Sequence, residues 1–152
     1  MKLAEALVER KSLKDEIQDL RRRLQRVAKV QEGDSPVEDP RALLQTIESK
    51  LGELERRIAQ INRTNMAARL ADGRTLMEAI AERDMLSLRR SALDGLVEAA
   101  LPEHNRYSRT EIRYVATVDV AEMQKQADQV AKRYRELDAQ IQALNWETEL
   151  VE

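Results

Sequence analysis

Hydrophobic residues recur at helical spacing along most of the chain, and this pattern predicts four long helices. The first covers residues 2–29, and its apolar positions follow steps of four and three: Leu13, Ile17, Leu20, Leu24 and Val27. The last has the most regular run: Met123, Ala127, Val130, Tyr134, Leu137, Ile141 and Leu144. Such spacing is typical of helices that pack along their length. The expected fold is mainly α, an antiparallel helical bundle or coiled coil in a single helical domain over residues 1–152.

Local signals predict where the second and third helices begin. Asp39 is a good N-cap, and Pro40 follows at the first helical position, where its missing N–H costs nothing. Thr75 and Glu78 have the spacing of a capping box, so a third helix is expected to begin near Leu76.

An acidic loop over residues 31–39 separates the first two helices. It contains four acidic residues and no basic one, with Gly33 able to end a helix and Pro36 unable to continue one. The acids could screen the arginines of the preceding turn or bind a cation. The loop lacks the ligand register of an EF-hand, so no metal site is predicted. We expect the two flanking helices to fold back on each other as a hairpin.

Between the third and fourth helices the period changes from helical to two. Alternating apolar residues predict a short strand or extended segment over residues 105–118, with Tyr114 and Val118 on one face. A lone strand leaves its backbone groups unpaired. Its partner could be a short hairpin arm at residues 105–108 or the same strand of another subunit, and the alternative is an extended loop.

Polar residues interrupt the apolar stripes between Ile61 and Arg90. Asn65 takes the place of the next hydrophobe, and Arg83 and Arg90 occupy heptad positions that should face other helices. Arg83 is expected to pair with a neighbour rather than with Asp84, because adjacent helical residues diverge. Three hypotheses stay open: a buried polar layer that fixes register and oligomeric state, a pocket for a small anion or nucleotide, or plain exposure to solvent. The candidate binding residues are Asn62, Asn65, Arg74, Arg83 and Arg90.

Composition limits the kind of fold, the partners and the compartment that we expect for the protein. Few aromatic residues and 36% charged residues are typical of long helices. A net charge of −2 gives no field that would attract nucleic acid or an anionic membrane, and neither partner is expected. The absence of cysteine excludes disulfides and thiolate chemistry. Without a signal-peptide core or an apolar run near ~18 residues, a soluble, cytoplasmic protein is expected.

No arrangement of residues suggests catalysis. The single histidine, His104, lies in a polar loop without an oriented partner for acid–base chemistry. A glycine-rich phosphate loop and an H-E-x-x-H motif are both missing. We therefore expect no enzyme, no cofactor and no metal. Apolar stripes on several faces suggest a homo-oligomer, and the only tryptophan, Trp146, is expected to dock against the bundle, since tryptophan buries a large area.

Several segments resemble a family of uncharacterised bacterial helical proteins, some of which carry the name septicolysin. These segments run nearly end to end: Val30–Asp34, Ile61–Asn65, Asp72–Leu76, Arg106–Ile112 and Ile141–Trp146. The resemblance implies a helical fold and transfers no catalytic residue. The name implies a thiol-activated, pore-forming cytolysin, whereas this chain has no cysteine. The leading hypothesis is a non-catalytic, self-assembling protein with a scaffolding or interaction role. An anion- or nucleotide-binding module and a membrane-active toxin are the alternatives.

Overall fold

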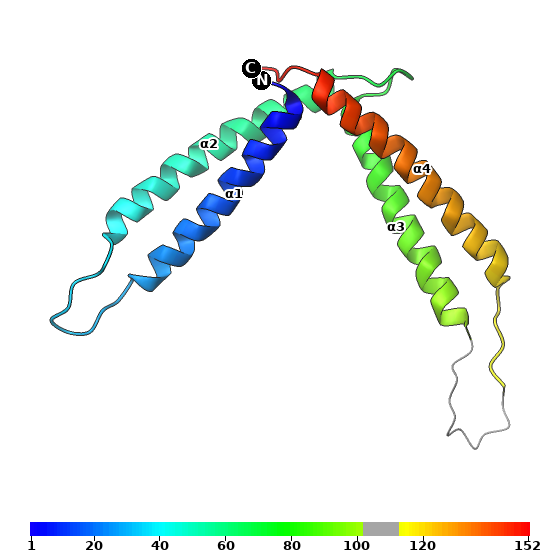
Figure 1. The fold of residues 1–152 in the computed structure, drawn as a ribbon, viewed down its shortest axis with the longest axis horizontal. Coiled ribbons are helices and arrows are strands. Elements are labelled where there is room, and N and C mark those ends of the chain that lie inside the picture. Colours follow the sequence, from blue (N-terminus) through cyan, green and yellow to red (C-terminus); the bar gives the residue numbers. More distant parts are fainter. Residues whose placement is uncertain (102–112) are drawn as a thin grey trace. The chain divides into compact units, whose positions relative to one another are not determined.

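The computed structural model describes residues 1–101 and 113–152, which fold mainly into helices (Figure 1). The helices in chain order are α1 (Leu3–Arg26), α2 (Pro40–Ala67), α3 (Leu76–Ala100) and α4 (Val120–Glu147). The predicted mainly α fold with four long helices is confirmed.

The chain divides into two compact units. The first unit consists of Met1–Arg69 together with Gln142–Glu152, and the second consists of Leu70–Ile141. The expectation of a single domain stays a prediction.

The first unit contains the predicted hairpin of α1 and α2, which lie side by side (Figure 1). Its second helix begins as expected, because the Asp39 carboxylate accepts a hydrogen bond from the Arg41 backbone N–H at 2.9 Å and Pro40 follows at once. A cluster of buried residues near the loop holds the helices together: Leu20, Leu43 and Ile47, with Leu24 and Val27 packed against them. The regularly spaced apolar residues of the two helices therefore form a shared core.

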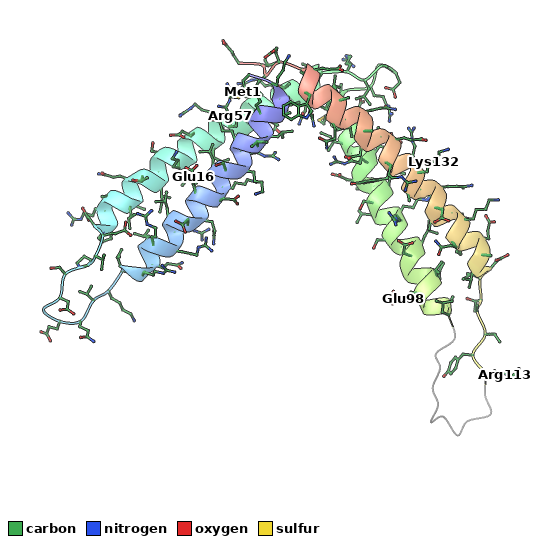
Figure 2. All side chains as sticks on the ribbon, in the orientation of Figure 1. Met1, Glu16, Arg57, Glu98, Arg113 and Lys132 are labelled. Atoms are coloured by element: carbon green, nitrogen blue, oxygen red, sulfur yellow. The ribbon has the colours of Figure 1, made fainter. Side chains whose placement is uncertain are left out.

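Ion pairs run along the same hairpin. Arg57 of α2 reaches Glu9 of α1 at 2.8 Å, and Lys50 reaches Glu16 at 3.1 Å. Figure 2 labels Arg57 on α2 and Glu16 on α1. Burial is greatest at Arg57, whose side chain is only 19% exposed. These cross-helix pairs border the apolar contact. Each of them joins an acidic residue of α1 to a basic residue of α2.

The acidic loop folds toward the end of α1. Glu38 forms an ion pair with Arg23, with 3.1 Å between the Arg23 Nε and a Glu38 oxygen. The Arg23 hydrogen bond holds the pKa of the Glu38 carboxyl below its ordinary value. Gly33 adopts a φ of 90°, which suits glycine in a turn. Of the two predicted roles for the loop acids, charge screening of an α1 arginine is confirmed at Glu38.

The C-terminal segment of the first unit pairs with the start of the chain. Lys2 and Glu149 form an isolated antiparallel bridge, and the Leu3 N–H donates to the Thr148 carbonyl at 2.9 Å. The Lys2 ammonium also lies 2.7 Å from a Glu149 carboxylate oxygen. Residues far apart in sequence therefore hold the two ends of the chain together.

Thr64, a fully buried polar residue of α2, anchors the same segment. Its hydroxyl donates to the Gln60 carbonyl at 2.8 Å and accepts the Val151 backbone N–H at 3.0 Å. A hydroxyl can both donate and accept, so one buried oxygen satisfies two backbone groups.

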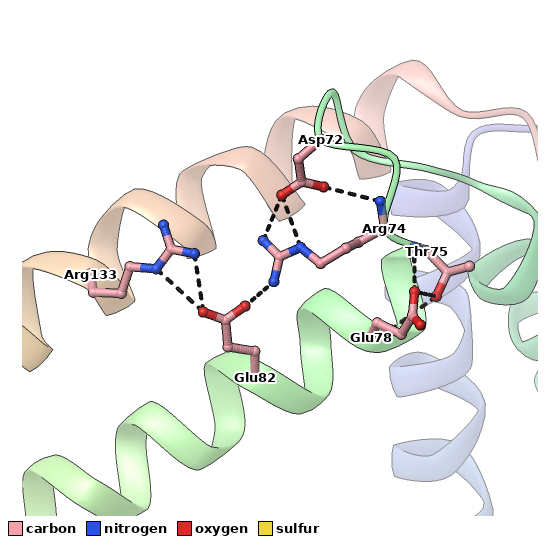
Figure 3. Close-up of polar contacts among 6 residues, drawn as sticks. All are labelled: Asp72, Arg74, Thr75, Glu78, Glu82 and Arg133. Carbon is pink, nitrogen blue, oxygen red and sulfur yellow. Dashed lines mark hydrogen bonds and ion pairs between the residues drawn. The ribbon is translucent and has the colours of Figure 1, made fainter.

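In the second unit, α3 begins with the predicted capping box (Figure 3). The Thr75 hydroxyl accepts the Glu78 N–H at 3.2 Å, and the Glu78 carboxylate accepts the Thr75 N–H at 2.8 Å. The start of α4 is capped by Asp119, whose carboxylate accepts the Glu122 N–H at 3.1 Å. Ion pairs join α3 to α4, and the two helices lie side by side (Figure 1).

The expected strand is not present in the part of segment 105–118 that the structure describes. Residues 113–118 form no strand, and Tyr114 and Val115 are 95% and 81% exposed. Residues 105–112 and His104 lie outside the described residues. Alternating β-branched residues favour extended backbone, but a strand also needs a paired neighbour.

Trp146 does not dock as expected. Its residue is 59% exposed, whereas the preceding Asn145 is only 5% exposed. Successive residues on a helix point about 100° apart, so burying Asn145 beside the Ile141 face turns Trp146 outward. The direction of the helix face, not hydrophobicity, decides which of the two is buried.

Candidate functional site

The five residues predicted as a polar centre are divided between the two units. Asn62 and Asn65 lie on α2 in the first unit, where Asn62 is exposed and Asn65 is half-buried. Arg74, Arg83 and Arg90 lie in the second unit. Neither unit by itself contains all five residues, and each arginine has carboxylate partners of its own.

Arg74 is the centre of an ion-pair chain that joins the turn before α3 to α4 (Figure 3). Its guanidinium lies 2.7 Å from the Asp72 carboxylate and also pairs with Glu82 of α3. Glu82 in turn accepts from Arg133 of α4, with 3.1 Å between the Arg133 Nη2 and a Glu82 oxygen. The order is Asp72–Arg74–Glu82–Arg133, so positive and negative groups alternate.

The ion-pair chain fixes the charge of its members. Hydrogen bonds from Arg74 hold the pKa of the Asp72 and Glu82 carboxyls below their ordinary values. The same bonds raise the pKa of Arg74. All three groups therefore stay ionised at neutral pH, and their pairing sets the position of the turn and of α3 against α4.

Arg83 faces the neighbouring helix, as predicted. Its Nη1 donates to the Asp138 carboxylate of α4 at 3.1 Å, and its side chain is 23% exposed. It also pairs with Asp84 at 3.0 Å, so the expectation that Asp84 would not be its partner was wrong. A long arginine side chain can reach along its own helix and across to the next. Burial acts to lower the pKa of Arg83, but hydrogen bonds to Asp84 and Asp138 raise it above its ordinary value.

Arg90 does not face another helix. Its side chain is 53% exposed and pairs with Asp94, one turn further along α3, at 3.3 Å. Arg83 and Arg90 belong to the same heptad series, yet only Arg83 meets a carboxylate of α4. A polar contact between α3 and α4 is therefore present at Arg83–Asp138. The anion-binding hypothesis stays a prediction, and an anion would compete there with carboxylates already bound to each arginine.

A shallow hollow lies between α1 and α2 in the first unit. It is lined by Glu9, Leu13, Glu53, Arg56, Arg57 and Gln60. Acidic and basic side chains are mixed in its walls, and Arg57 is held by Glu9. This arrangement favours no single ligand charge.

A second apolar surface, not expected from the sequence, runs along α3. We call it the apolar stripe; its members are Met77, Ala81, Met85, Leu88, Ala92, Leu96 and Ala99, all exposed. Their spacing of four, four and three residues, repeated twice, keeps them on one side of a helix. The signal was present in the sequence. The heptad positions expected to face other helices, Arg83 and Arg90, lie instead on the side of α3 that contains Leu86 and Leu93.

Little of α3 is buried. Of its 25 residues, all of them described, only Leu76 and Ala79 in the first turn are buried. On the side facing α4, Leu86, Leu93 and Val97 are partly buried. This helix therefore has apolar residues on two sides. The side toward α4 is partly covered, and the other side is exposed.

Comparison with known proteins places the chain in a family. Residues 10–150 match the family of unknown function DUF6847. The chain belongs to DUF6847. This DUF6847 protein is also similar to a solved structure, the crystal structure of a functionally unknown conserved protein from Corynebacterium diphtheriae. The two chains are 43% identical, the match covers 99% of each, and the TM-score is 0.94.

No curated protein matches this DUF6847 chain. The resemblance to uncharacterised helical proteins is confirmed, whereas neither the family description nor the similar structure mentions septicolysin. Within the described residues, no helix is long and apolar enough to cross a membrane.

Proposed function

We propose that this DUF6847 protein is a non-catalytic, self-assembling helical protein of the cytoplasm with a scaffolding or interaction role. The observation that carries this proposal is the small buried fraction of α3, despite its two apolar sides. Most helical stability in proteins comes from packing an apolar face, not from helix propensity. A contiguous exposed apolar surface marks an interaction site. A helix that faces α4 with one apolar side and exposes another is suited to bind another protein chain.

The electrostatics of the second unit support a structural role. Proton transfer at neutral pH needs groups whose pKa values move toward neutrality. Here the pKa of Asp72 and Glu82 is lowered and the pKa of Arg74 and Arg83 is raised, which moves each away from neutrality. Such groups hold charges in place and suit a fixed helix arrangement better than acid–base chemistry.

Sedimentation velocity and light scattering on the full chain test self-assembly directly. The expected result is a mass that is a multiple of 17.5 kDa, with dissociation on dilution. A mass of 17.5 kDa at every concentration, from micromolar to near-millimolar, would overturn the proposal.

The two alternative functions have separate assays. A membrane-active protein would release dye from phosphatidylcholine or mixed anionic vesicles, and we expect no release. An anion-binding module would bind inorganic phosphate or ATP in calorimetry and lose that binding in Arg83→Gln with its assembly intact. Heat of binding from the wild-type chain would favour that alternative.

A further inference from the structure

We propose that the apolar stripe of α3 binds the same stripe of a second copy of this chain, with the two α3 helices antiparallel. This inference rests on the proposed self-assembly and names the surface, the partner and the orientation.

The large members of the stripe are exposed along its whole length. Met77, Met85, Leu88 and Leu96 are 50%, 58%, 64% and 38% exposed. From Met77 to Ala99 the stripe spans about 33 Å of helix at ~1.5 Å per residue. Exposed large hydrophobic residues elsewhere on the helices are more scattered. On α2, for example, Leu44, Leu51 and Met66 share no such continuous spacing.

The size of the surface fits a pair of identical helices. The exposed parts of the seven residues amount to roughly 500 Å² on each copy, or roughly 1,000 Å² in a pair, where specific interfaces begin. The spacing repeats every 11 residues, or 3.67 per turn, close to the 3.6 of a straight helix. Two nearly straight α3 helices can therefore remain in contact over the full stripe.

The order of large and small residues favours the antiparallel orientation. With a two-fold axis beside Leu88, Ala81 of one copy lies opposite Leu96 of the other, and Met85 lies opposite Ala92. Large side chains then fill the space that each alanine leaves, as close packing requires. A parallel pair in register would instead place each of Ala81, Ala92 and Ala99 opposite its own copy, leaving gaps in three layers.

Polar residues border the stripe on both sides, which is the arrangement of an apolar interface with a solvated rim. The bordering residues are Glu78, Glu82 and Arg89 on one side and Asp84, Ser91 and Glu98 on the other. None of the seven stripe residues is needed for the ion pairs between α3 and α4. The surface can therefore change without loss of the contacts that join these two helices.

Disulfide trapping tests the orientation, because the chain has no cysteine of its own. Oxidation of Leu88→Cys should join two copies across the two-fold axis. Met77→Cys is the matched control: it is also on the stripe, and in the antiparallel pair its two copies lie about 34 Å apart, too far for a disulfide. Rapid cross-linking of Leu88→Cys but not of Met77→Cys is the expected result. Cross-linking of Met77→Cys, or none at Leu88→Cys, would overturn the antiparallel pairing.

Charge insertion tests the surface independently. Met85→Glu should weaken assembly by roughly a hundredfold in dissociation constant, because each copy would bury an unpaired carboxylate. Ser87→Glu adds the same charge to an exposed residue of α3 off the stripe, and its assembly should match wild type. If both variants assemble like wild type, the stripe is not the interface, although self-assembly stands. If wild type is monomeric, both proposals fail.

Discussion

Arg83 and Arg90 lie seven residues apart on α3, and the structure predicts very different consequences for the same substitution at each. Arg83→Gln removes the cation that faces Asp138 of α4, 3.1 Å away, and leaves that carboxylate beside the α3–α4 contact without it. Arg90→Gln removes only a pair with Asp94 on the same helix. The two variants carry the same substitution and differ in the carboxylates that the arginine contacts.

The expected magnitude follows from exposure. The Arg83 and Asp138 side chains are 23% and 33% exposed, between a surface pair and a buried one. Surface pairs contribute about 0–1 kcal/mol, and breaking a buried pair costs about 3–5 kcal/mol. Discounted for solvent screening, Arg83→Gln should lower the free energy of unfolding by about 1–2 kcal/mol. Arg90→Gln should change it by less than about 0.5 kcal/mol.

Urea unfolding followed by circular dichroism at 222 nm measures both variants. Protein concentration must be the same in every experiment, because self-assembly makes apparent stability depend on it. A double-mutant cycle with Asp138→Asn isolates the pair, with an expected coupling energy of about 1 kcal/mol.

Two results would contradict the predicted role of the Arg83–Asp138 pair. One is a coupling energy below about 0.3 kcal/mol, within the error of additive sites. The other is an equal loss of stability in Arg83→Gln and Arg90→Gln. That result would mean that the contact between Arg83 and α4 contributes no stability beyond that of a charged residue on the surface of α3.

Three further predictions concern other contacts. Arg74 lowers the pKa of Glu82, so the stabilisation by its charge is complete above the unfolded value of about 4.3 and is lost as pH falls through the lower folded value. The urea midpoint should therefore fall less below about pH 4.3 in Glu82→Gln than in wild type, and parallel profiles would contradict this. Thr64→Val removes the acceptor of the Val151 N–H, so it should cost about 1–3 kcal/mol; unchanged hydrogen exchange at that amide would exclude the role. Gly73 has a φ of 88° and open space at its Cβ position, so Gly73→Ala should cost about 1 kcal/mol through backbone strain alone. Gly73→Asn should cost less, because asparagine tolerates positive φ, and equal losses in thermal melts would argue against strain.

Much of the helical framework could be predicted because its signals are local. Asp39 caps α2 through the N–H of Arg41, and Thr75 and Glu78 satisfy each other's backbone groups at the start of α3. All of these contacts lie within three residues in sequence. The apolar spacing of α1 and α2 also predicted their hairpin, because both stripes need cover and a single loop joins them.

The candidate site was less predictable, because its partners are distant in sequence. Arg133 lies 51 residues from Glu82 in the ion-pair chain, and Asp138 lies 55 residues from Arg83. No local pattern distinguishes Arg83, which meets α4, from Arg90, which meets solvent and its own helix. The expected strand is absent from the described residues 113–118 for a related reason, since backbone pairing depends on a neighbour.

The sequence alone determined which residues share a face of each helix, because the helical repeat of 3.6 residues is a property of the backbone. What covers each face depends on how the helices pack in the folded chain. That packing buries polar Asn145 and exposes Trp146, and it leaves the apolar stripe of α3 open. Burial depends on which elements meet in space, and a periodic pattern contains no information about the neighbour. The apolar stripe of α3 therefore needs a partner outside the two helices, and we propose that this partner is a second copy of the chain.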